Sequence, residues 1–150
     1  MIQRIQTVFL FLAIVALGLY LYLPLITVEN GKFTDSINGF DVSHTLPFMD
    51  QPYRYMFNLI FAGIGAGFSL IAIFLYKNRS VQMLLCWFAI IFIVSAQAFV
   101  FYKYQTKVFM GDVILRKWNL FSLVAIVFEI LAFAYIRKDE ETIKSMDRLR

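Results

Sequence analysis

The sequence predicts an all-α membrane protein, an antiparallel bundle of four transmembrane helices. The 150-residue chain is 61% hydrophobic and only 16% charged, whereas globular domains average about 45–50% apolar and about 25% charged residues. The apolar residues gather in four long stretches, each matching the ~20 residues that a helix needs to cross a bilayer. Because no intervening segment could bury its own core, residues 1–150 are expected to form a single domain. The expected spans are residues 5–26, 55–76, 81–102 and 118–136.

The first span resembles a signal peptide in its basic start at Arg4 and its apolar run. The run is longer than the ~7–15 residues of a signal-peptide core, and it ends in bulky residues 20–24 rather than a small-x-small cleavage site. A retained helix is therefore expected.

The loops at residues 27–54 and 103–117 are predicted to form small extracytoplasmic β-hairpins. Asn30-Gly31 is a strong signal for a two-residue turn, which would pair Val28 with Phe33. Gly111-Asp112 could turn a second hairpin between residues 106–110 and 113–115. Four strands sharing an apolar face would be more stable than either hairpin alone. The alternative is that both loops are irregular, and residues 36–51 are expected to form coil or one short turn.

The second span contains small residues at helical spacing. Gly63 and Gly67 form a G-x-x-x-G pair, and Ala62 and Ala66 form a second small pair. Small residues let helix backbones approach closely in lipid, where close packing drives association. The pair therefore indicates packing of this helix within the bundle, or alternatively a dimer face.

Glu129 is the one acid inside a span. A charged side chain at the bilayer centre costs about 2.5–3.5 kcal/mol on insertion scales, so this residue should face the bundle interior. Counting residues from the span ends places Ser69 at a similar depth, as the best polar partner. Glu129 is expected to be a hydrogen-bonded structural acid or one that reaches the inner interface; the alternative is an intramembrane proton site.

The segment 137–150 is expected to continue the fourth span as a short cytoplasmic helix. Its apolar residues recur every three positions, and i,i+4 charge pairs support the helix. The tail could act as a basic anchor or dock a partner, through Ile143, Met146, Arg148 and Leu149.

Four spans place both termini on one side of the membrane. Lys and Arg are somewhat more frequent on that side, and the loop 27–54 is acidic, so cytoplasmic termini are expected.

No catalytic, cofactor or metal site is predicted. The single cysteine, Cys86, cannot form an internal disulfide, and the single histidine, His44, lacks the three or four ligands of a metal site. No nucleotide-binding, nucleophile-elbow or zinc-protease motif occurs, and no block of like charge suggests nucleic acid.

The two ends of the chain, Met1–Thr7 and Arg137–Glu140 with Lys144–Arg150, resemble those of a family of small four-pass inner-membrane proteins of Gram-negative bacteria, a domain of unknown function. The resemblance implies a location in the inner membrane and termini on the same side, without an activity.

These observations favour a non-enzymatic subunit or scaffold of an envelope complex, with the lipid bilayer and membrane proteins as partners. The alternatives are a small transporter or channel that uses Glu129, or an enzyme acting on lipid or quinone, for which no cluster of interfacial Asp, His or Arg is found.

Overall fold

The protein is mostly helical, and its four long helices confirm the predicted fold class. The computed structural model describes residues 5–30, 33–39, 56–76, 78–105, 112–115 and 117–147. Each helix is long and apolar enough to cross a membrane, as expected of a multi-pass membrane protein. The elements are α1 (Ile5–Tyr22), β1 (Pro24–Asn30), β2 (Phe33–Asn38), α2 (Met56–Phe74), α3 (Arg79–Gln105), β3 (Asp112–Leu115), the short 3-10 helix η1 (Lys117–Asn119) and α4 (Leu120–Asp147).

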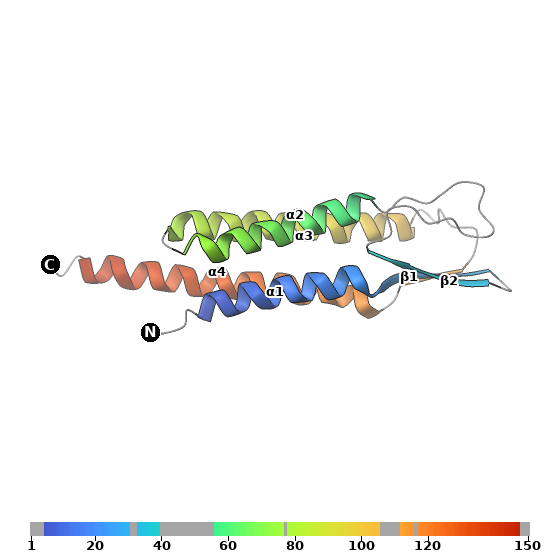
Figure 1. Cartoon of the computed structure of the whole chain (residues 1–150), viewed down its shortest axis with the longest axis horizontal. Helices are drawn as coiled ribbons and strands as arrows, with labels where there is room; N and C mark the ends of the chain where they lie inside the picture. Colours follow the sequence, from blue (N-terminus) through green and yellow to red (C-terminus); the bar gives the residue numbers. More distant parts are fainter. Residues whose placement is uncertain are drawn as a thin grey trace.

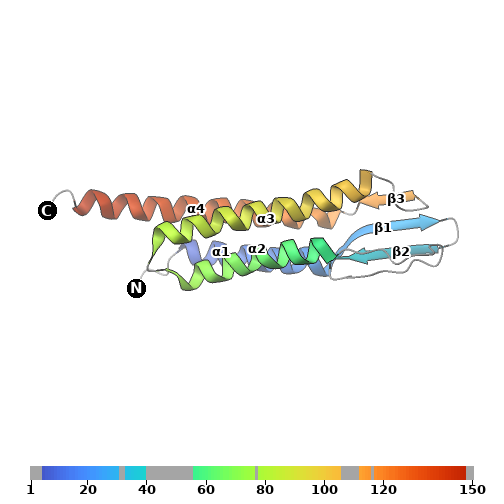
Figure 2. The same cartoon turned by 90° about the horizontal axis from the view of Figure 1, so that it is seen from above.

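The helices form a four-cornered bundle. α1 packs beside α2 and α4, and α3 packs beside the same two helices, so α1 and α3 occupy one diagonal and α2 and α4 the other. Figures 1 and 2 show that α1 begins, α2 meets α3, and α4 ends at one end of the bundle, while the strands extend from the other end. We call the first the terminal end and the second the sheet end.

The end of the first helix differs from the predicted span, whereas the continuation of the fourth helix agrees with the prediction. α1 ends at Tyr22 rather than near residue 26, because Pro24 has no N–H for a helical hydrogen bond and disfavours helical geometry in the residue before it. The residues that follow, Leu25 and Ile26, are buried in β1 instead. The predicted continuation of the fourth span as a helix is present, since α4 continues without interruption to Asp147; Figure 1 shows it extending beyond the other helices.

The strands form one antiparallel sheet in the order β2-β1-β3. The register between β1 and β2 corrects the prediction, because Asn30 pairs with Phe33 and Val28 with Asp35. The two residues between the paired ends are therefore Gly31-Lys32, one position later than the Asn-Gly turn that the sequence suggested. Residues 36–38, predicted as coil, belong to β2.

The second predicted hairpin is only partly within the described residues. β3 begins at Asp112, which was expected in a turn, and it joins the same sheet as β1 and β2 by pairing with β1. The other predicted arm, residues 106–110, lies outside the described residues, as do residues 40–55, which include His44.

Close backbone approaches set the packing at two glycines. A Cβ on Gly39 would lie 2.8 Å from Leu21 Cα, so the end of the β1–β2 hairpin fits against the end of α1 only without a side chain. A Cβ on Gly65 would lie 3.1 Å from Ile93 Cγ1 and 3.4 Å from the Ala89 carbonyl oxygen. This glycine lets α2 approach α3 closely.

Candidate functional site

A polar cluster that we call the central site lies inside the bundle. It joins Glu129 of α4, Ser69 of α2 and Cys86 of α3, and each of these side chains is 0% exposed. The Ser69 hydroxyl hydrogen-bonds to Glu129 Oε1, and the Cys86 thiol faces the same carboxyl group. The contact between Ser69 and Glu129 that was predicted from their depths is therefore present.

The hydrogen bond between Ser69 and Glu129 connects two helices on a diagonal of the bundle. Ser69 Oγ also lies 3.0 Å from the Gly65 carbonyl oxygen, one turn earlier on α2. A serine hydroxyl carries one proton, so Ser69 can donate to the Gly65 carbonyl or to the Glu129 carboxyl group, but not fully to both. If Ser69 donates to the carbonyl, then the Glu129 carboxyl group must be protonated to donate the hydrogen bond that joins it to Ser69. Glu129 Oε2 has no hydrogen-bond partner among the described residues.

A second group of buried polar side chains lies nearer the sheet end. The Tyr20 hydroxyl donates to Asn58 Oδ1 at 2.8 Å, and Ser122 Oγ lies 2.8 Å from Gln97 Oε1. Asn119 Nδ2 donates to the Leu25 carbonyl at 2.7 Å, which fixes the start of α4 against β1. Asn58 and the part-buried Gln97 thus have partners other than Glu129.

An apolar layer separates these two polar levels. Leu17, Ile93 and Ala125 pack together in one cluster and are at most 1% exposed. Ala125 lies about one helical turn from both Ser122 and Glu129, so the cluster lies between the two levels. The layer consists of side chains that cannot bind or relay a proton or an ion.

The glycine pair of α2 does not pack inside the bundle, which corrects the first interpretation of this motif. A Cβ built on Gly63 or Gly67 would meet nothing within 4 Å. The inward-facing small residues are instead Ala62, Gly65 and Ser69, all of which are buried. The dimer-face alternative for the outward pair stays a prediction.

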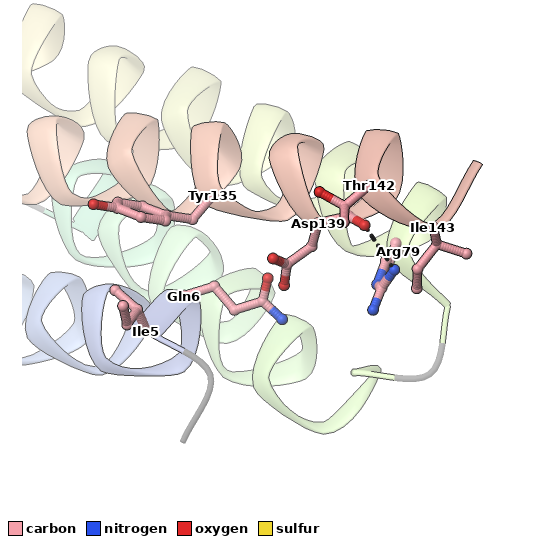
Figure 3. A pocket seen from close by; sticks show the side chains of 7 residues that line it. All are labelled: Ile5, Gln6, Arg79, Tyr135, Asp139, Thr142 and Ile143. Carbon is pink, nitrogen blue, oxygen red and sulfur yellow. Dashed lines mark hydrogen bonds between the residues drawn. The ribbon is translucent and has the colours of Figure 1, made fainter. Parts of the chain in front are cut away.

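A cavity that sequence reasoning missed opens at the terminal end, and we call it the end cavity. It measures about 300 Å³ and lies between α1, the start of α3 and α4. Figure 3 shows the Gln6 amide and the Asp139 carboxyl pointing toward one another, with Arg79 beside them. Arg79 Nη1 donates to the Asp139 carbonyl oxygen at 3.1 Å. The full lining is Ile5, Gln6, Arg79, Tyr135, Asp139, Thr142 and Ile143.

Of the predicted tail residues, only Ile143 has a described side chain, which lines this cavity and is 39% exposed. Met146 lies in the last turn of α4, and Arg148 and Leu149 lie outside the described residues. Nothing in the spacing of Gln6, Arg79 and Asp139 along the chain indicated that they meet, because each comes from a different helix. Within the described ranges, no three His, Cys, Asp or Glu side chains are grouped as a metal site would require.

Comparisons with known proteins identify the family. No curated protein and no solved structure matches the chain. The sequence model of a domain of unknown function, DUF4293, matches residues 2–149. The chain therefore belongs to the DUF4293 family.

Proposed function

We propose that this protein is a non-enzymatic subunit or scaffold of a membrane complex in the bacterial inner membrane. The observation that supports this role most is the apolar layer of Leu17, Ile93 and Ala125 between the two polar levels. A channel or carrier needs a polar route from one side to the other, whereas among the described residues this apolar layer separates the two polar levels, whose hydrogen bonds connect neighbouring elements.

The extensions at the two ends of the bundle are suited to binding partners on either side. At the terminal end, α4 projects beyond the other helices and exposes charged side chains, including the ion pairs Arg137–Glu141 and Lys144–Glu140. At the sheet end, β2 and β3 form the edges of a three-stranded sheet. In our proposal the terminal end faces the cytoplasm and the sheet lies outside it, in line with the charge distribution of the sequence.

The docking role of the tail can be tested by removing its last residues while the end cavity stays complete. We propose to compare the full chain with one truncated after Lys144 and with one in which residues 145–150 are replaced by Gly and Ser at the same length. Crosslinking in cells, mild-detergent purification and mass spectrometry would then identify neighbouring chains. We expect both variants to lose the same membrane-protein neighbour, at normal abundance; an unchanged set of neighbours in both would contradict tail docking.

A second candidate function is a small transporter that uses Glu129. It is favoured by one observation, the fully buried carboxyl whose Oε2 has no partner among the described residues. Glu129→Gln distinguishes the two functions, because glutamine can still hydrogen-bond to Ser69 but cannot exchange a proton. A scaffold should keep its abundance and its neighbours with this substitution, whereas a proton-coupled transporter should lose proton uptake in reconstituted vesicles.

A further inference from the structure

We propose that the end cavity binds the headgroup of a phospholipid that carries a primary ammonium group, such as a phosphoethanolamine lipid. The proposal goes beyond the scaffold role and does not depend on it. It starts from Gln6, which is 1% exposed and lines the cavity. Neither its Nε2 nor its Oε1 has a hydrogen-bond partner among the described residues.

An amide buried without partners indicates that something is missing from its surroundings. Buried side-chain polar groups in proteins are nearly always hydrogen-bonded, to protein or to another molecule. The Gln6 amide offers both N–H donors and a carbonyl acceptor, so its natural occupant carries both acceptors and donors. A purely apolar chain would leave the amide unsatisfied.

The charges around the cavity narrow the choice of occupant. Arg79 contributes a guanidinium group that donates one N–H to the Asp139 carbonyl oxygen and has further N–H donors. A guanidinium group binds phosphate well. Asp139 contributes one carboxyl group, which points toward the Gln6 amide. One cation and one anion fit a zwitterion, with the phosphate near Arg79 and the ammonium near Asp139. An anionic headgroup would bring its negative charge close to this carboxyl.

Four other charged side chains of α4 near the cavity form ion pairs with one another, and one of them, Glu140, also lies close enough to Arg79 to interact with its charge. Arg137 pairs with Glu141 at 2.9 Å, and Lys144 pairs with Glu140 at 2.8 Å. None of these four side chains lines the cavity. Among the described residues, Arg79 and Asp139 are the charged residues that line the cavity.

The rim of the cavity fits an amphiphile rather than a small soluble ligand. Ile5 is 51% exposed, and Tyr135 and Ile143 are also exposed. Figure 3 shows the Tyr135 hydroxyl pointing away from the polar groups, and its ring stacks on Phe9 beside the cavity. The cavity lies where the apolar part of α4 gives way to its charged residues, which is the depth of lipid headgroups. Its volume is at the lower end of the ~300–1,000 Å³ range of ligand pockets, enough for a headgroup but not for acyl chains.

The first experiment uses the unmodified full chain and lipids of identical acyl composition. The protein would be purified in mild detergent and titrated with dioleoyl phosphatidylethanolamine, phosphatidylcholine or phosphatidylglycerol, with bound lipid counted by native mass spectrometry. We expect about tenfold tighter binding of the ethanolamine lipid than of the other two, because a primary ammonium donates charge-assisted hydrogen bonds to a carboxylate that a quaternary ammonium cannot donate. Equal binding of all three, or tightest binding of phosphatidylglycerol, would overturn the proposal.

A second experiment uses a soluble competitor to distinguish binding of a membrane lipid from binding of a free headgroup. O-phosphoethanolamine shares the two charges but lacks acyl chains, so we expect it to compete with the bound lipid only at a concentration at least about a hundredfold higher. If it binds as tightly as the lipid, the assignment to a membrane lipid is wrong.

Variants then locate the binding. We expect Asp139→Asn to remove the preference for ethanolamine over choline, and Arg79→Gln to weaken both lipids about tenfold. The matched controls Glu141→Gln and Arg137→Gln remove the same charges from the same part of the chain but outside the cavity, and they should change nothing. Unaltered selectivity in folded Asp139→Asn would overturn the assignment. Should Arg79→Gln fail to fold, as judged by gel filtration, the lipid series and Asp139→Asn still decide the matter.

Discussion

The central site and the end cavity both contain a buried polar side chain, but they differ in how that side chain is satisfied. At the central site, Glu129 Oε1 hydrogen-bonds to Ser69 on the diagonally opposite helix and the carboxyl group faces Cys86 in the interior of the bundle, so only Oε2 has no partner among the described residues. At the end cavity, Gln6 is equally buried, yet both atoms of its amide lack a partner among the described residues and an opening leads to the surface.

The difference suggests separate roles for the two regions. A polar contact enclosed by four helices stabilises one arrangement of those helices, because breaking it leaves a buried group unsatisfied. A polar group that is buried beside an opening can instead be satisfied by a molecule from outside. In our proposal the central site is a structural contact, and the end cavity is where this protein binds another molecule.

The largest change in the free energy of unfolding is expected from a substitution at Gly65, where α2 approaches α3 closely. Gly65→Leu places a side chain against Ile93 and the backbone of α3 and should destabilise the bundle by about 3 kcal/mol. The control is Gly63→Leu, the same substitution two residues away on the outward face. Unfolding in mixed micelles, followed by circular dichroism, measures both; equal stability of the two variants would show that α2 does not face α3 in this way.

A smaller effect is expected from the central hydrogen bond itself. Ser69→Ala removes the partner of Glu129 and should cost about 1 kcal/mol, the usual size of such a bond between transmembrane helices. Glu129→Gln should cost less, because the glutamine amide can still bond to Ser69. A double-mutant cycle on the two residues, read from the same unfolding curves, would give a coupling energy near zero if they are not in contact.

The smallest effect is expected on the outward face of α2. Gly63→Leu and Gly67→Leu meet open space, so each should change the free energy of unfolding by less than about 0.5 kcal/mol. The same samples, analysed by sedimentation in detergent, report the oligomeric state. A destabilisation comparable to that of Gly65→Leu would mean that these glycines pack inside the bundle after all.

Hydropathy and depth were enough to predict the four helices and the contact of Ser69 with Glu129. Length and composition alone indicate a transmembrane helix, and two polar groups at equal depth in an apolar bundle are driven together. The direction that each helix faces was harder to predict, because lipid-facing and core-facing residues are both apolar. For this reason Gly63 and Gly67 were expected inside the bundle, where Gly65 is found instead.

The register of the sheet and the end cavity were harder to predict from the sequence, for two further reasons. The register of β1 and β2 depends on which two residues form the turn, and the strong Asn30-Gly31 signal was one position away from the residues between the paired ends. The end cavity depends on three helices meeting. In the sequence, Arg79 and Asp139 are ordinary charged residues near the ends of spans, and Gln6 is a polar residue in the first turn of a helix. None of the three therefore indicates a cavity by itself.

The account rests on the central site being closed to water, and the single native cysteine tests this without any substitution. Cys86 lies beside Glu129 and is 0% exposed. We expect a small, hydrophilic thiol reagent to leave Cys86 unmodified in folded protein reconstituted in lipid and to modify it fully after denaturation in SDS. Cys86→Ala with Ile143→Cys, which carries its thiol at the exposed end cavity, is the positive control. Labelling of Cys86 in the folded protein as fast as in the denatured protein would reveal a water path to Glu129 and would contradict the structural role in favour of transport.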